Sequence, residues 1–273
     1  MVDTIKDPQD FEKDISDTVI TEIRARFKPP IIAAIGAKEP ERDHYSHEIG
    51  HHVGYNLRSL LENGKGGHIA TGGSKGVGVH IYQGVLAWCR SPEAEKVYNT
   101  QHTKDADHIP DKFFALQSQG ADPHQDYEVA LHAATVDPDQ RGAKRTLRVI
   151  NAGKDGQLRR WYLGAVADLT VVVNGEEGTL EEALVSLYKK KPVVTIYQSG
   201  RVATLLADLK SSGAKNYDER AAVVRSYGFD PEDKNFRFLL GNGRVDLSNI
   251  HIVRGNKREQ LRRNLQKFVE RLK

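Results

Sequence analysis

Short apolar runs alternate along the chain with segments whose apolar residues recur at helical spacing. The helical spacing predicts helices over residues 8–27, 43–63, 78–89, 156–168 and 256–273. A further helix is expected after Thr179, with an apolar stripe from Leu180 to Tyr188. The apolar runs between them lack the polar alternation of a half-exposed strand. We expect strands in the segments PPIIAAIG, HIAT, KFFALQ, TLRVIN, LTVVVN, PVVTIY and SNIHIVRG. Buried strands separated by helices indicate an α/β fold with a mainly parallel sheet and helices on both faces.

The pair Pro29-Pro30 ends the first helical segment, because proline does not continue a helix. We therefore expect residues 1–28 to form an N-terminal helical extension, and residues 29–273 to form a single domain. The polar stretch 91–111 predicts a loop. Residues 121–140 are acidic and rich in turns, and their D-x-H-x-D pattern is more typical of a solvated loop than of a lid, a partner surface or a metal site.

Charge and composition exclude several classes of protein. The 40 Lys and Arg residues against 37 Asp and Glu give a net charge of +3, which does not favour binding to nucleic acid. Apolar runs stay well short of the roughly 20 residues of a membrane span. The start, MVDTIKDPQDFEKD, lacks the basic-then-apolar build of a signal peptide, and the single cysteine, Cys89, fits a reducing compartment. We expect a cytoplasmic protein.

The segment HEIGH, residues 47–51, matches the H-E-x-x-H pattern of zinc proteases. The longer protease pattern needs a third histidine where this chain has Leu57, and a methionine turn, whereas the one methionine is Met1. At 100° per residue, the histidines lie opposite the apolar stripe that includes Ile49 and Val53. We therefore favour a solvent-facing helix surface over a zinc site and expect no metal ion.

Two glycine-rich turns each follow a predicted strand and precede a predicted helix. They are TGGSKGVG, residues 71–78, and NGEEGTLEEA, residues 174–183. Glycine lets the backbone approach a ligand closely, and the free N–H groups at a helix start attract anions. In the second turn, Thr179 and Glu182 have the spacing of a capping box. Glu182 is therefore either a cap partner or a carboxylate held beside an anion site.

Arg159 and Arg160 lie near the start of the helical segment between the two turns. Adjacent helical residues point about 100° apart, so we expect at most one of the two to face inward. A buried arginine needs an anionic partner, such as a phosphate or a carboxylate at the start of the next helix. The alternative is an arginine pair on the surface.

The order of these motifs resembles the LOG branch of the SLOG superfamily, proteins once labelled possible lysine decarboxylases. That family has a G-G-G-x-x-G turn, an arginine-lysine helix and the signature P-G-G-x-G-T-x-x-E. Here TGGSKG, LRRWYLGAVAD ending at Asp168, and NGEEGTLEE followed by KPVVTIY correspond to them. The resemblance covers residues 30 to 200. It also places HEIGH and Gly54 on the family's first helix, which removes the protease interpretation.

The resemblance implies a Rossmann-like homodimer that binds a nucleotide and uses no cofactor. Many members hydrolyse the N-glycosidic bond of a nucleoside 5′-monophosphate, releasing the base and ribose 5-phosphate. Glu182 would then hold the ribose and stabilise its oxocarbenium-like transition state, and Arg159 or Arg160 would act near the sugar–base bond. The residues implied to cradle the phosphate are Gly175, Gly178 and Thr179, and those implied to form the other wall are Gly72, Gly73 and Gly76.

This chain departs from the family pattern at both turns. Asn174-Gly175-Glu176 replaces Pro-Gly-Gly, and Glu177 fills the variable position, so two carboxylates would repel a phosphate unless they point away. Thr71 replaces the first glycine of the other turn. Related SLOG proteins bind nucleotide-derived signals or carry a pterin without hydrolysis. A non-catalytic sensor or carrier is therefore the alternative function.

Overall fold

The computed structural model describes residues 11–37, 44–64, 66–72, 76–98, 112–118, 148–241, 243 and 245–272. In this part of the chain, seven strands form one sheet in the order β4-β3-β2-β1-β5-β6-β7. Every neighbouring pair is parallel. The strands are β1 (Ile31–Gly36), β2 (His68–Gly72), β3 (Phe113–Gln117), β4 (Arg148–Asn151), β5 (Leu169–Val173), β6 (Val193–Ile196) and β7 (Ile250–Val253).

The strand order reverses between β1 and β5. From β1 the chain proceeds outward through β2, β3 and β4, and it then returns to place β5 on the other side of β1. Parallel strands that diverge in this way leave a crevice beyond their carboxyl ends, where ligands of open α/β sheets bind. We therefore expect a ligand site among the loops that follow β1, β2 and β5.

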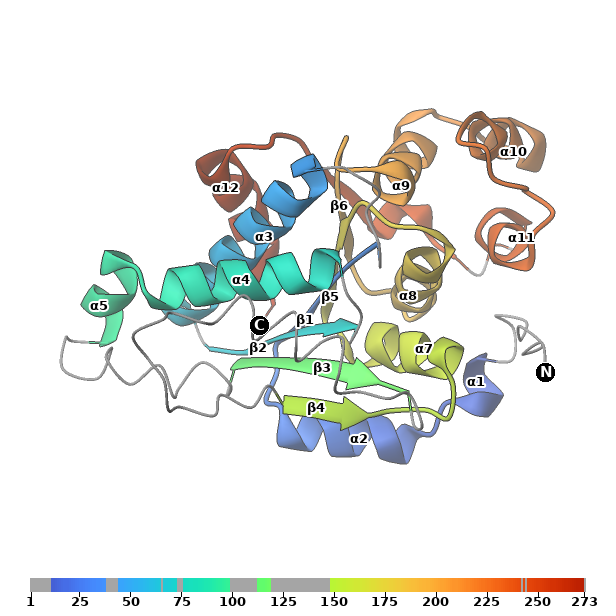
Figure 1. The fold of residues 1–273 in the computed structure, drawn as a ribbon. Helices are drawn as coiled ribbons and strands as arrows, with labels where there is room; N and C mark the ends of the chain where they lie inside the picture. The colour runs from blue at the N-terminus through green and yellow to red at the C-terminus, as the bar shows by residue number, and fades with distance from the viewer. Residues whose placement is uncertain are drawn as a thin grey trace.

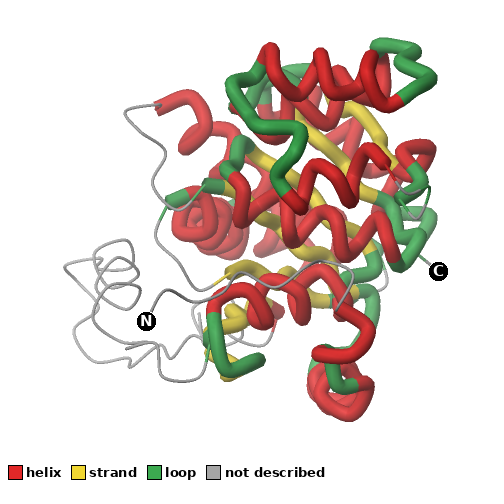
Figure 2. The backbone as a smooth tube through the Cα atoms, turned by 90° about the vertical axis from the view of Figure 1, so that its right-hand side faces the viewer, coloured by secondary structure: helices red, strands yellow, loops and turns green. Residues whose placement is uncertain are grey.

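Helices cover both faces of the parallel sheet, as the apolar pattern predicts (Figures 1 and 2). The fold is therefore a three-layer α/β architecture of the Rossmann-like kind that the resemblance implies. One apolar cluster joins the sheet to α3, α4 and α12, and another joins it to α2, α7, α8, α9, α10 and α11. The helices are α1 (Phe11–Asp14), α2 (Asp17–Arg26), α3 (His44–Asn63), α4 (Val77–Cys89), α5 (Pro92–Tyr98), α7 (Gly156–Val166), α8 (Glu177–Tyr188), α9 (Arg201–Ser211), α10 (Tyr217–Ser226), α11 (Lys234–Gly241) and α12 (Arg258–Val269), with a 3-10 turn at Leu247–Asn249.

Glycines set the spacing between neighbouring helices. A Cβ added to Gly54 on α3 would lie 1.9 Å from the carbonyl oxygen of Ile81 on α4. A Cβ on Gly84 would lie equally close to the carbonyl oxygen of His51, at 1.9 Å. On the other face, a Cβ on Gly164 of α7 would lie 2.5 Å from the carbonyl oxygen of Glu182 on α8. The close approach of α7 to α8 brings the arginines of one helix within reach of the carboxylates of the other.

The N-terminal segment packs on the sheet domain through polar and aromatic contacts. Arg24 on α2 forms a 2.9 Å ion pair with Asp168 and donates a 2.7 Å hydrogen bond to the carbonyl of Val166 at the end of α7. Asp168 also accepts a hydrogen bond from the backbone N–H of Ile31, at 2.9 Å. Asp168 therefore ties α2 to the start of β1, at the opposite end of the sheet from the crevice.

The structure corrects three of the sequence-based expectations. The single helix expected over residues 8–27 is divided into α1 and α2. Residues 92–98, expected to be part of a loop, form α5. The three helices α9, α10 and α11 were not predicted. The acidic segment 121–140 lies outside the described residues. Among the helices that the structure describes, none has the length and apolar character to cross a membrane.

Candidate functional site

A cavity of about 150 Å³ lies beyond the carboxyl ends of β1 and β2, at the reversal point of the strand order. The first turns of α4, α7 and α8 contribute to its wall, so residues distant in sequence meet there. The lining residues are Ile35, Gly36, Ala37, Thr71, Gly72, Gly78, Arg159, Arg160, Glu176, Gly178, Thr179 and Glu182. This position is where a ligand of a doubly wound sheet is expected.

A buried ion pair joins Arg159 of α7 to Glu182 of α8. Arg159 Nη1 lies 3.0 Å from Glu182 Oε1, and the side chains are 13% and 7% exposed. Burial raises the pKa of the Glu182 carboxyl, and the positive charge of Arg159 opposes that rise. Burial also lowers the pKa of Arg159, and Glu182 opposes that change. Each charge therefore depends on the other, because an isolated buried charge is costly.

Gly72, the last residue of β2, leaves the space that this ion pair occupies. A Cβ added to Gly72 would lie 1.9 Å from Arg159 Nη1 and 3.3 Å from Glu182 Oε1. The N-terminus of α7 is fixed by Asp155, whose side chain accepts a 2.8 Å hydrogen bond from the backbone N–H of Leu158. The helix start and the absent side chain together direct the guanidinium of Arg159 onto the end of β2.

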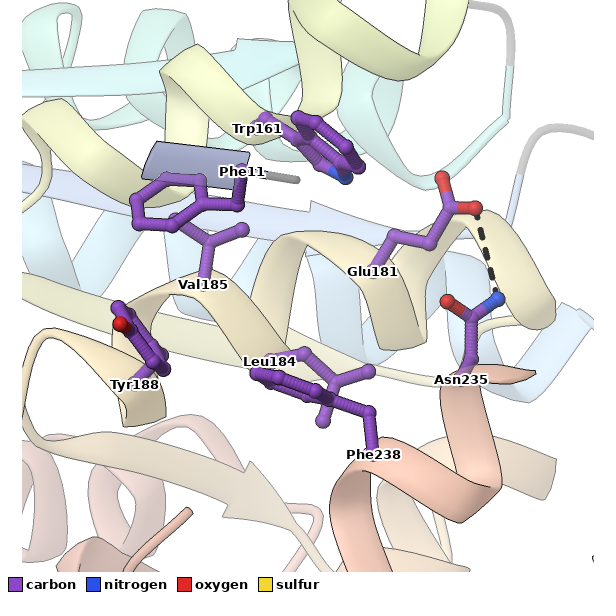
Figure 3. A pocket seen from close by; sticks show the side chains of 8 residues that line it. All are labelled: Phe11, Trp161, Glu181, Leu184, Val185, Tyr188, Asn235 and Phe238. Atoms are coloured by element: carbon purple, nitrogen blue, oxygen red, sulfur yellow. Dashed lines mark hydrogen bonds between the residues drawn. The ribbon is translucent and has the colours of Figure 1, made fainter. Parts of the chain in front are cut away.

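A second pair, Arg160 with Glu181, lies beside the first. Arg160 Nε donates a 2.5 Å hydrogen bond to Glu181 Oε2, and the side chains are 27% and 5% exposed. The other carboxylate oxygen of Glu181 lies 3.4 Å from the amide nitrogens of Gln157 and of Asn235 on α11. Figure 3 shows the contact between Glu181 and Asn235 as a dashed line, in a separate pocket that Phe11 and Trp161 also line. Glu181 thereby fixes Arg160 at the wall of the cavity.

A third pair, Glu176 with Arg201, lies where α8 and α9 begin. Arg201 Nη1 lies 3.2 Å from Glu176 Oε2, and the side chains are 39% and 58% exposed. The Glu176 carboxylate is therefore directed toward a cation of α9 as well as bordering the cavity. The arginines of the three pairs become progressively more exposed, from Arg159 through Arg160 to Arg201, and only the third pair has an exposed carboxylate.

The HEIGH segment lies on α3, where α4 packs along the same helix. Glu48 is exposed, but His47 and His51 are half-buried, and the rings of His47 and His80 stack with centroids 3.9 Å apart. The expected solvent-facing surface therefore holds for Glu48 and only in part for His47 and His51, because α4 covers part of it. Within the described residues, no group of three or more His, Cys, Asp or Glu side chains could hold a metal ion.

The structure places most of the predicted site residues around this cavity. Gly72, Arg159, Arg160, Gly178, Thr179 and Glu182 line it. Gly175, with φ of 116°, lies under the side chain of Thr179, to which an added Cβ would approach within 2.6 Å. Gly76, with φ of 98°, is the N-cap of α4. Gly73 lies outside the described residues.

Two expectations about these residues are wrong. Thr179 is not the N-cap of α8, because the helix begins two residues earlier and Glu176 holds the cap position. Glu182 consequently pairs with Arg159 instead of closing a capping box. Both Arg159 and Arg160 line the cavity, because a long side chain can bend back over the neighbouring helix. Arg160 does so across Gly178, where an added Cβ would lie 3.3 Å from Arg160 Cδ.

Three residues that complete the site, Glu181, Asn235 and Arg201, were not predicted from the sequence. Glu181 was adjacent to the expected carboxylate, and its partner Asn235 lies 54 positions further along the chain. Arg201 opens α9, a helix that the apolar pattern did not predict. The adjacent glutamates Glu181 and Glu182, which match the adjacent arginines Arg159 and Arg160 in number, are the local signal that could have suggested a second ion pair.

The sheet order, the two helical layers and the cavity at the reversal point define a Rossmann-like α/β protein with a charged switch-point site. No protein-family model matches the chain, and no curated protein matches it. Among solved structures, the X-ray structure of TM1055, a structural genomics target, is similar with a TM-score of 0.46 and 15% identity. The match covers 88% of this chain and 99% of that chain.

Proposed function

We propose that this protein binds a nucleotide at the switch-point cavity and hydrolyses the N-glycosidic bond of a nucleoside 5′-monophosphate. The observation that supports it is the buried Arg159–Glu182 pair, 3.0 Å apart, at the wall of the cavity. Cleavage of an N-glycosidic bond leaves positive charge on the sugar ring in the transition state. A carboxylate held in advance beside that charge stabilises it without reorganisation.

The proposed reaction uses water as its second substrate. The bond between C1′ and the base nitrogen breaks, and its electron pair leaves with the base. A water oxygen forms the new bond to C1′, and the proton released from that water neutralises the departing base. Glu182 would hold the ribose hydroxyls and the developing cation. Burial raises the pKa of this carboxyl, and Arg159, 3.0 Å away, favours its ionised form and opposes that rise.

The cavity wall provides the remaining contacts. The first turn of α8, at Gly178, has backbone N–H groups that no earlier residue of the helix can bind, and such groups attract anions. Arg160 adds a cation that Glu181 holds in place. These features support a phosphorylated ligand with its sugar near Glu182.

The test is incubation with a panel of nucleoside 5′-monophosphates, read by chromatography for released base. Glu182→Gln keeps the size of the side chain and should lower base release by about 100-fold or more. Glu177→Gln removes an exposed carboxylate from the same helix and is the matched control, with unchanged release expected. Equal activity in both variants, or release that persists in Glu182→Gln, would contradict the assignment of Glu182.

A non-catalytic sensor or carrier is the second candidate. The Glu176 carboxylate at the cavity favours it, because a negative charge near the proposed phosphate site opposes substrate binding. In that case equilibrium dialysis should recover the nucleotide intact and bound, with no free base at any time. Release of base that depends on Glu182 would exclude this candidate.

A further inference from the structure

The turn between β5 and α8 is fastened to the start of α9. The Asn174 side-chain oxygen accepts a 3.2 Å hydrogen bond from the backbone N–H of Arg201. The backbone N–H groups of Val202 and Ala203 donate to the carbonyls of Gly175 and Asn174, each at 3.2 Å. These bonds hold the backbone of the turn in place. The carboxylate of Glu176 at its edge can therefore move by rotation of its side chain while the backbone stays where it is.

Arg201 is held in place mainly by groups other than Glu176. Its Nε donates a 2.9 Å hydrogen bond to the carbonyl of Tyr227, and its Nη2 donates a 3.0 Å bond to the carbonyl of Gly228. Its guanidinium carbon lies 3.9 Å from the ring centroid of Phe229. The third nitrogen, Nη1, faces Glu176. If the Glu176 carboxylate turned away, the cation would remain where it is.

The contact between Glu176 and Arg201 is suited to exchange. The Glu176 side chain is 58% exposed, and the pair is 3.2 Å apart. An exposed ion pair contributes little to stability, because solvent screens it and ordering two side chains is unfavourable. By contrast, Glu182 and Glu181 are 7% and 5% exposed, so their arginines are fixed partners.

We propose that Glu176 and Arg201 form an exchangeable anion site, in which a phosphate of the ligand replaces the Glu176 carboxylate on Arg201 Nη1. Glu176 borders the cavity at the N-cap position of α8, and its carboxylate reaches from there to Arg201 at the start of α9. This inference rests on the proposed function, because it names the residues that recognise the phosphate of the same ligand. Arg201 then binds the phosphate, and Glu176 lowers the affinity for phosphate because its carboxylate competes for Arg201.

The experiment measures the binding of ribose 5-phosphate, and of inorganic phosphate and ribose as comparison probes, by titration calorimetry. Glu176→Gln should bind ribose 5-phosphate about three- to fivefold more tightly than the unmodified protein, the range that loss of one exposed ion pair allows. Glu177→Gln makes the same change in net charge one residue away and should leave the affinity unchanged. Ribose, which has no charge, should bind all variants equally.

Arg201→Gln should weaken the binding of ribose 5-phosphate by about tenfold or more, because it removes a charged hydrogen-bond donor. Its folding is checked by thermal unfolding, since Arg201 also binds the carbonyls of Tyr227 and Gly228. If that variant does not fold, the comparison of Glu176→Gln with Glu177→Gln decides alone, because both side chains are exposed.

Equal affinities for Glu176→Gln and Glu177→Gln would overturn the inference, as would a folded Arg201→Gln protein with unchanged affinity. Absence of ribose 5-phosphate binding in all variants would also overturn it. Failure of the proposed function is separate. Tight phosphate binding governed by Glu176 and Arg201, with no base release from any nucleotide, would leave the anion site in place and exclude the hydrolase.

Discussion

A Cβ on Gly72 would lie 1.9 Å from Nη1 of Arg159. A side chain at position 72 would therefore need the space that the guanidinium of Arg159 fills. The same Nη1 binds Glu182 at 3.0 Å. The position of a strand residue without a side chain thus determines where the charges of two different helices meet. The glycine leaves room for the ion pair of Arg159 and Glu182, and these two side chains line the cavity.

Gly72→Ala is therefore expected to displace Arg159 from Glu182 and to lower the free energy of unfolding by about 1–3 kcal/mol, the range for an overpacked site. Ligand binding at the cavity should be lost with it. Gly241→Ala is the control, because its nearest neighbour would lie 3.8 Å away. Urea denaturation of both variants checks the prediction. An unchanged midpoint for Gly72→Ala would show that Arg159 has another position available.

The buried pair also predicts a non-additive pair of substitutions. Arg159→Met alone or Glu182→Leu alone leaves one buried charge without its partner and should cost about 3–5 kcal/mol of unfolding free energy. The double variant removes both charges, and it should be far less destabilised than the sum of the two. A double-mutant cycle from urea denaturation measures the coupling. Additive losses would mean that solvent or another group already neutralises each charge.

The sequence was sufficient to predict the sheet and most of the helices around it. Apolar runs such as LTVVV, residues 169–173, become strands whose residues are all buried. The resemblance implied that the glycine turns after β2 and β5 form two walls of one site, and Gly72 and Gly178 do line one cavity. Parallel strands end at one edge of the sheet, which brings these turns together. Local patterns succeed here because burial on both faces leaves a clear sequence signal.

The remaining features depend on contacts between distant parts of the chain. Glu181 is held by Asn235 from α11, a helix that the apolar pattern did not reveal. Helix geometry predicted that at most one of Arg159 and Arg160 faces inward, and both line the cavity because an arginine side chain is long enough to reach it. The role of Glu176 depended on Arg201, whose helix was also not predicted. The charges of a site can be read from sequence more readily than their partners.

We predict that acid lowers the free energy of unfolding, because histidines are half-buried between α3 and α4. Burial lowers the pKa of His80 below its ordinary value of 6.5, and the neighbouring His47 lowers it further. In the unfolded chain His80 binds a proton near pH 6.5, so below that pH the unfolded state takes up more protons than the folded state. The free energy of unfolding should therefore decrease as the pH falls below about 6.5.

His80→Gln removes that titrating group and should make the loss of stability below pH 6.5 smaller than in the unmodified protein. Urea denaturation at several pH values between 5 and 7 gives the two curves, a range set by the ordinary pKa of histidine. Parallel curves would assign the acid sensitivity to other groups. His51 is the first of these to examine, because burial and His52 lower its pKa as well.

The two glycines of α3 should respond differently to the same substitution. Gly54→Ala places a Cβ 1.9 Å from the carbonyl oxygen of Ile81, whereas Gly50→Ala places one 3.3 Å from the Cβ of His80. Alanine gains about 1 kcal/mol over glycine inside a helix, so Gly50→Ala should be nearly neutral or stabilising. Gly54→Ala must push α3 away from α4 and should lose about 1–3 kcal/mol or more. Thermal unfolding of the two variants tests this order, and equal effects would mean that the helices separate at little cost. Because Gly78 in the first turn of α4 lines the cavity, a shift of α4 in Gly54→Ala should also weaken ribose 5-phosphate binding.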